Sequence, residues 1–178
     1  MSIGTADRDK LLRSLVKEAD QAILLEAEEN SDLEGMGTTI TGAILSDGIA
    51  YWVHVGDSRM YLLRDGGLNQ VTRDQNWAQF LVDEGEISAE EAQSHVLGNL
   101  LDQCVGCGEC EPETGHLEIR KGDILMLSTD GLHDEVSRDA ISRILISRND
   151  IKNKAKTLID AALEGGGKDN ITVVLVEV

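Results

Sequence analysis

Two aspartates stand at the ends of strongly apolar segments, where their carboxylates would be held rigidly. Asp130 follows the I-L-M-L-S run at 124–128, and Asp169 precedes the I-T-V-V run at 171–174. Gly131 follows the first aspartate, so the backbone there can come close to an ion or a phosphate. Two carboxylates brought together repel each other unless a cation or a proton lies between them. The pair therefore points to a hard divalent cation, and the simpler interpretation is that each aspartate only stabilises its own turn.

A second group of residues with chemical potential is the run of cysteines Cys104, Cys107 and Cys110. Their C-x₂-C-x₂-C spacing is typical of zinc or iron–sulfur ligation, in which a fourth ligand completes the site. That ligand would have to be His95, His116 or a residue of another chain. The alternatives are a disulfide or redox role, and loop cysteines without function.

The composition restricts the class of protein. The 178 residues carry a net charge of -17, which argues against binding the nucleic-acid backbone, because that requires clustered cations. No segment reaches the roughly 18 apolar residues needed to cross a bilayer. The first residues also lack the basic start and apolar stretch of a signal peptide. We therefore expect a cytoplasmic protein without nucleic-acid or membrane partners, in which disulfides are not the default state of the cysteines.

The elements that would position these residues can be predicted from hydrophobic periodicity. Three- and four-residue spacing predicts helices, and β-branched runs between Asp-Gly turns predict strands. The predicted helices cover 7–30, 74–95 with a break at 85–88, 135–147 and 151–163, and the predicted strands cover 38–45, 49–55, 59–64, 68–71, 113–119, 124–128 and 171–178. The last strand is so continuously apolar that we expect it to be buried. Runs of strands with helices set apart predict an α+β layered sandwich.

Local features add detail to this pattern. Asp7 is placed to cap the first helix, and Ser88 with Glu91 has the spacing of a capping box. His54 lies in a predicted strand, so we expect it to be a packed core residue and not a ligand. His133 closely follows Asp130 and could therefore approach the site.

Five segments, in order and with similar spacing, resemble the motifs of one enzyme family. They are G-M-G-T-T at 35–39, H-V-G-D-S-R at 54–59, L-N-Q-V-T-R-D at 68–74, G-D-I-L-M-L-S-T-D-G-L at 122–132 and G-K-D-N-I-T-V at 167–173. Together they resemble the later motifs of the metal-dependent protein serine/threonine phosphatases, the PPM or protein phosphatase 2C family, and its bacterial branch in particular. Residues 83–92 are similar to that branch's flap subdomain. The resemblance covers nearly the whole chain from about residue 9.

The resemblance implies a fold, a cofactor and a substrate class. The fold would be an α-β-β-α sandwich forming a single phosphatase-like domain over 1–178, with a flap-like insertion at about 74–112. The cofactor would be a binuclear Mn²⁺ or Mg²⁺ centre whose bridged water attacks a phosphoserine or phosphothreonine ester. By motif position, Asp130 and Asp169 would be ligands of one metal, and Asp74 would hold a third metal with Asp130. Asp57 would be mainly structural.

The sequence departs from the family pattern in one respect. Family members begin with an Arg-containing strand and an Asp-Gly-x-Gly-Gly segment whose aspartate bridges both metals, and no such segment occurs in these 178 residues. We therefore expect a fold truncated at the N-terminus, weak metal binding and a homodimer that covers the exposed sheet edges. No residue is assigned a catalytic role. An incomplete phosphatase, a pseudophosphatase acting as a binding module and a small cysteine–metal protein remain the three readings of the function.

Overall fold

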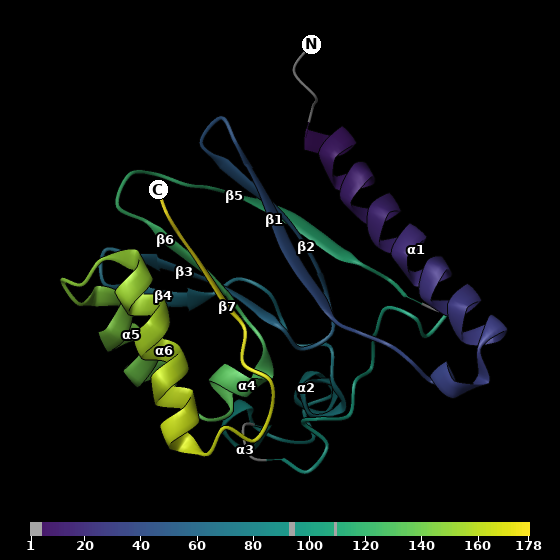
Figure 1. Ribbon diagram of the computed structural model, residues 1–178. Coiled ribbons are helices and arrows are strands. Elements are labelled where there is room, and N and C mark those ends of the chain that lie inside the picture. Colours follow the sequence, from purple (N-terminus) through teal and green to yellow (C-terminus); the bar gives the residue numbers. More distant parts are fainter. Residues whose placement is uncertain (1–4, 93–94, 109) are drawn as a thin grey trace. The chain divides into compact units, whose positions relative to one another are not determined.

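The chain divides into two compact units, each containing one sheet. The computed structural model describes residues 5–92, 95–108 and 110–178 (Figure 1). The first unit comprises the residues up to Ser46, Ala50–Asp57 and Asp74–Leu117, and the second comprises Asp47–Ile49, Ser58–Arg73 and Glu118–Val178. The units are described separately below. The expectation of a single domain with a flap-like insertion stays a prediction.

A long helix and a three-stranded sheet form most of the first unit. Helix α1 (Thr5–Glu29) is followed by the short 3₁₀-helix η1 (Ser31–Leu33). The sheet has the order β1-β2-β5, with β1 at Ile40–Ser46, β2 at Ile49–Val55 and β5 at Glu113–Glu118. The predicted first helix is confirmed, but it starts at Thr5, so Asp7 lies in its first turn and is not its cap.

The centre of this sheet is buried, as its sequence indicates. Residues Ala50 to Val55 of β2 are all buried. Asp47 and Gly48 join β1 to β2 with positive φ angles of 54° and 75°, the conformation that Asp-Gly turns favour in hairpins. His54 is fully buried and its Nδ1 lies 2.8 Å from Thr41 Oγ1, which confirms it as a core residue.

Two short helices precede β5 in the sequence of the first unit. They are α2 (Trp77–Asp83) and α3 (Ala89–Ala92), and residues 93 and 94 of the predicted 74–95 segment lie outside the described residues. The predicted capping box is confirmed, because the Ser88 N–H donates to Glu91 Oε2 at 2.8 Å and the Glu91 N–H donates to Ser88 Oγ at 3.2 Å.

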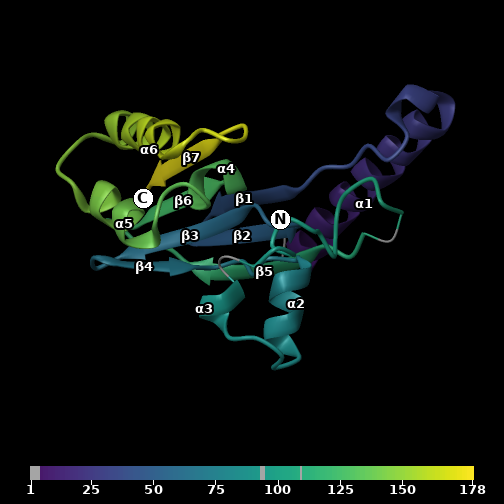
Figure 2. The same ribbon diagram turned by 90° about the horizontal axis from the view of Figure 1, so that it is seen from below.

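The second unit contains a four-stranded antiparallel sheet in the order β4-β3-β6-β7. Its strands are β3 (Arg59–Arg64), β4 (Gly67–Gln70), β6 (Ile124–Ser128) and β7 (Val173–Glu177), and its helices are α4 (Asp130–His133), α5 (Arg138–Ile146) and α6 (Ile151–Gly165). Helices α5 and α6 lie beside one face of this sheet (Figure 2). Tyr61 and Met126 of the sheet share a buried core with Ile141 of α5 and Leu158 of α6.

The last strand is less buried than its apolar sequence predicts. Strand β7 is the end member of its sheet and pairs only with β6 among the described strands. Its residues alternate between half-buried and exposed, and Val174 is 49% exposed. The prediction of a buried strand was therefore wrong. The composition of one strand does not determine its position in the sheet, and an end strand is less covered than a central one.

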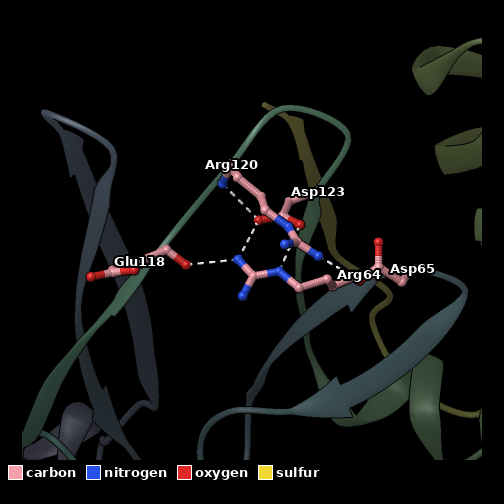
Figure 3. A network of polar contacts seen from close by, with 5 residues as sticks. All are labelled: Arg64, Asp65, Glu118, Arg120 and Asp123. Atoms are coloured by element: carbon pink, nitrogen blue, oxygen red, sulfur yellow. Dashed lines mark hydrogen bonds and ion pairs between the residues drawn. The ribbon is translucent and has the colours of Figure 1, made fainter.

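A buried carboxylate fixes the start of β6 (Figure 3). The Asp123 side chain is 2% exposed, and it accepts hydrogen bonds from Arg64 Nε at 2.9 Å and Arg64 Nη2 at 2.6 Å. The Arg120 N–H also donates to it at 2.8 Å, while the Arg120 side chain pairs with Asp65. The hydrogen bonds from Arg64 hold the pKa of Asp123 below its ordinary value, against the opposing effect of burial.

The structure has helices and sheets in both units, which confirms the predicted α+β class. Within the described ranges, none of the helices combines the length and the apolar character that crossing a membrane requires.

Candidate functional site

The two acidic loops meet at the end of β6, within the second unit. The Thr129 N–H donates to the Thr172 carbonyl at 3.2 Å, and the Thr172 N–H donates to Thr129 Oγ1 at 3.0 Å. The Thr129 hydroxyl in turn donates to the Asn170 carbonyl at 3.2 Å. These bonds join the segment just before Asp130 to the segment just after Asp169. The structure therefore brings together the two loops that the sequence singled out.

Gly131 explains how the loops can come so close. A Cβ atom built at this position would clash with the carbonyl oxygen of Asn170 and would lie 3.0 Å from its carbonyl carbon. Those atoms belong to the backbone and cannot rotate away. Gly131 is also buried. The close neighbour at this glycine is the Asn170 backbone, and the expected approach of an ion or a phosphate stays a prediction.

Both carboxylates also stabilise their own turns. Asp130 Oδ1 accepts from the Gly131 N–H at 2.8 Å, and Asp169 Oδ1 accepts from the Asn170 N–H at 2.6 Å. Asp130 is half-buried and Asp169 is exposed. The local-turn interpretation is thus correct as far as it goes. It does not exclude a ligand role, because a carboxylate oxygen that accepts one hydrogen bond still has a second lone pair.

Carboxylate oxygens suit Mn²⁺ or Mg²⁺ in kind. The number of such ligands gathered at one place is small. The part of the chain that the structure describes contains no group of three or more His, Cys, Asp or Glu side chains able to hold a metal ion. Asp74 belongs to the first unit, whereas Asp130 and Asp169 belong to the second. Its predicted place beside Asp130 stays a prediction.

Asp57 and Asp74 lie on linked segments of the first unit. The Gly56 N–H donates to Gln75 Oε1 at 2.8 Å, and the Gln75 N–H donates to the Gly56 carbonyl at 2.7 Å. Gly56 has a φ of 103°, and a Cβ there would clash with the Thr39 side chain. The loop after β2 is therefore held tightly. The structural role predicted for Asp57 stays a prediction.

Sequence reasoning missed an ion pair beside the acidic loops. Lys168 Nζ lies 2.9 Å from Glu135 Oε1, and the Glu135 side chain is only 6% exposed. The hydrogen bond to Glu135 raises the pKa of Lys168. The two residues are far apart in the sequence and neither lies in a regular pattern, so no local signal could have paired them. The position of Lys168 next to Asp169 was the only indication.

The cysteines are arranged differently from the predicted metal site. Cys104 and Cys107 form a disulfide, and Cys110 is free and buried. This pairing matches the disulfide alternative and differs from the expectation that disulfides are not the default state of these cysteines. The zinc or iron–sulfur interpretation stays a prediction. Burial raises the pKa of the Cys110 thiol, which makes it a poor nucleophile.

The loop that carries the disulfide is docked within the first unit. Thr38 and Val105 exchange backbone hydrogen bonds of 2.9 and 2.8 Å. The Gly106 N–H donates to Oδ1 of the buried Asp20 at 2.6 Å. The two histidines considered as a fourth ligand have other contacts. The His116 ring lies 6.0 Å from the Tyr51 ring, and His95 Nδ1 accepts from the Leu97 N–H at 3.3 Å.

Comparison with known proteins identifies the family. The protein phosphatase 2C profile matches residues 2–164, so the chain belongs to the protein phosphatase 2C (PPM) family. A serine/threonine protein phosphatase from Mycobacterium tuberculosis, PstP, is 44% identical over 167 residues, which are 94% of this chain and 32% of that protein. The chain thus spans about a third of the length of this relative.

Solved structures show the same fold. The S. agalactiae serine/threonine phosphatase matches with a TM-score of 0.93 and 31% identity, over 99% of this chain and 73% of that chain. The catalytic domain of PstP in complex with 2 manganese ions matches with a TM-score of 0.83 and 41% identity, over 97% and 70% of the two chains. The PPM-type α+β fold predicted from the five motifs is confirmed.

Proposed function

We propose that this chain supplies the Asp130–Asp169 part of the metal site of a protein serine/threonine phosphatase. The observation that carries the proposal is the bonded contact between the two acidic loops, through Thr129, Asn170 and Thr172. Family membership supports the reaction class, and the manganese ions in the related PstP structure support the kind of metal. The substrate would be a phosphoserine or phosphothreonine side chain of another protein, as expected for a signalling phosphatase.

The residues of the chain have distinct parts in this proposal. Asp130 and Asp169 would offer carboxylate oxygens to Mn²⁺ or Mg²⁺, and Asp74 would join Asp130 at a further, weaker ion. The metal, when bound, supplies a water activated for attack on the phosphate ester. Gly131 lets the two loops meet, and the hydrogen bonds of Thr129 hold them together.

Manganese binding and phosphatase activity test the proposal together. In calorimetric titration, Asp130→Asn should lower the affinity for Mn²⁺ by about tenfold or more, because half of the ligand charge at this pair is removed. The same variant should hydrolyse p-nitrophenyl phosphate more slowly than the wild type. Asp139→Asn, at an exposed position of α5, is the matched control and should change neither reading. Folded wild-type protein that binds no Mn²⁺ at millimolar concentration would contradict the proposal.

A second candidate is a pseudophosphatase that binds phosphoproteins without hydrolysing them. It is favoured by the small number of ligands, since no group of three or more metal-binding side chains is found within the residues described. Phosphopeptide binding by calorimetry, without phosphate release at saturating Mn²⁺, would establish it. Phosphate release that depends on Asp130 would exclude it.

We also propose that the chain forms a homodimer in the cytoplasm. The supporting feature is strand β7, an end strand with an exposed Val174, because an unpaired strand edge favours pairing with a second chain. Sedimentation equilibrium should give twice the mass of the 178-residue chain. A monomer at about 100 µM, where specific micromolar association would be complete, would contradict this part of the proposal.

A further inference from the structure

One buried carboxylate lies beside the acidic loops without being a ligand candidate. Glu135 follows the short helix α4, which begins at Asp130, and its backbone N–H donates to the Leu132 carbonyl at 3.3 Å. The Asp134 N–H likewise donates to the Asp130 carbonyl at 2.9 Å. Asp130 and Glu135 therefore belong to one short hydrogen-bonded segment.

The loop that carries Asp169 packs directly on Glu135. A Cβ atom at Gly165 would lie 2.9 Å from the Glu135 carbonyl oxygen, and one at Gly166 would lie 3.0 Å from Glu135 Oε2. The chain can pass this close to the Glu135 main chain because position 165 is glycine. The backbone leading to Asp169 thus rests on both the main chain and the side chain of Glu135.

Asp169 is consequently held from both sides. On one side, Lys168 is paired with Glu135 at 2.9 Å. On the other, Asn170 and Thr172 are hydrogen-bonded to Thr129 at 3.2 and 3.0 Å. Both ties end on the segment that carries Asp130. Removing the ion pair would leave the hydrogen bonds of Thr129 and the packing of Gly165 and Gly166 as the contacts between the Asp169 loop and that segment.

We propose that Glu135 and Lys168 are a positioning pair that holds the Asp169 loop against the Asp130 segment. The pair differs from an ordinary surface ion pair, because Glu135 is 6% exposed while Lys168 is 79% exposed. An exposed pair contributes little, but a carboxylate withdrawn from water needs its counter-charge. Lys168 therefore orders the loop by neutralising Glu135. The consequence for metal binding rests on the proposed function, whereas the ordering of the loop does not.

Amide hydrogen exchange tests the ordering of the loop without any metal. Lys168→Met removes the charge at an exposed position, so the variant should fold. Exchange of the Asn170 and Thr172 amides, followed by NMR, should accelerate about tenfold in this variant, because local opening becomes easier. The Val178 amide, which donates to the Asp123 carbonyl at the other end of β7, should keep its wild-type rate.

A matched control separates positioning from a general effect of lost charge. Lys156 pairs with Asp160 on the exposed face of α6, with 71% and 49% exposure and a distance of 2.5 Å. Lys156→Met should leave the exchange of Asn170 and Thr172 unchanged, and Lys168→Arg should restore the wild-type rates. Equal exchange in Lys168→Met, Lys156→Met and the wild type would overturn the proposal.

Manganese titration of the same proteins separates this inference from the proposed function. Lys168→Met should weaken Mn²⁺ binding severalfold, and Lys168→Arg should recover it. A wild-type chain that binds no Mn²⁺ would refute the proposed function, while the exchange rates would still decide the positioning role. Faster exchange together with unchanged Mn²⁺ affinity would overturn the claim that the pair positions a ligand.

Discussion

Two nearly buried carboxylates stand at opposite ends of the same stretch of the second unit, and they are neutralised in different ways. Asp123 precedes β6 and is 2% exposed, and Glu135 follows α4 and is 6% exposed. Asp123 receives two bonds from Arg64, which is 30% exposed, and a third from the Arg120 N–H. Among the described residues, the only ion-pair partner of Glu135 is Lys168, a side chain that is 79% exposed.

The difference means that the segment is held rigidly at Asp123 and more loosely at Glu135. The planar guanidinium of Arg64 binds both oxygens of Asp123 and so fixes the orientation of both groups, whereas the ammonium of Lys168 acts as a point charge on a flexible stem. The first arrangement suits a strand that must stay in register. The second suits a loop with an exposed carboxylate, which must be held near a ligand and still adapt to it.

The largest expected effect comes from removing the fixed cation. Arg64→Met leaves the Asp123 carboxylate buried without its counter-charge, so we expect a loss of about 3 kcal/mol in the free energy of unfolding. Urea denaturation monitored by circular dichroism measures it. A loss below about 1 kcal/mol, the size typical of exposed pairs, would mean that the two ends of the segment do not differ.

Acid should weaken the same end. The pKa of Asp123 is lowered in the folded protein, chiefly by the hydrogen bonds from Arg64. The stabilisation is therefore complete above the unfolded-state value of about 4 and is lost as the pH falls through the lower folded-state value. Wild-type stability should fall more steeply below pH 4 than that of Arg64→Met. Parallel pH profiles for the two proteins would assign the acid sensitivity to other carboxylates.

Exchanging the type of cation gives a smaller and more selective effect. Arg64→Lys keeps the charge but loses the two-pronged geometry, so we expect a cost of about 1.5 kcal/mol. Lys168→Arg should be within about 0.5 kcal/mol of the wild type, the usual range for exposed positions. Equal costs at the two positions would show that geometry matters no more for Asp123 than for Glu135.

Removing the charge of Lys168 in Lys168→Met should also have a small effect on global stability. Water reaches Lys168 and screens its pairing, so the cost in the free energy of unfolding should be well below that of Arg64→Met, in contrast to its effect on local exchange. Urea denaturation at low and high salt measures it, and the difference from wild type should shrink in 1 M NaCl, where the Debye length is about 3 Å. A cost as large as that of Arg64→Met would show that Glu135 depends on Lys168 as strongly as Asp123 depends on Arg64.

Much of this arrangement could be predicted from local sequence signals. The runs around Ile49–Val55 and Ile124–Ser128 have the strand bounds that their apolar patterns predict, and the Ser88–Glu91 capping box forms as its spacing indicates. The motif positions of Asp130 and Asp169 led to two loops that are in contact. Each of these features depends on a few neighbouring residues, which is why the sequence alone was sufficient.

What failed depends on contacts between distant segments. Strand β7 looks buried by composition, but its exposure follows from its place at the end of the strand order. Spacing alone could not distinguish metal ligation from the Cys104–Cys107 disulfide, because both need cysteines a few residues apart. The Glu135–Lys168 pair forms only once α6 and the following loop have returned to α4, so no short window of sequence contains it.

The contact between the acidic loops depends on a glycine at position 131. The space between this residue and the Asn170 backbone is too small for a single methyl group. Gly131→Ala would push the two loops apart, although every carboxylate and hydroxyl of the site would remain in the chain. The contact between the two acidic loops in this chain therefore requires glycine at position 131.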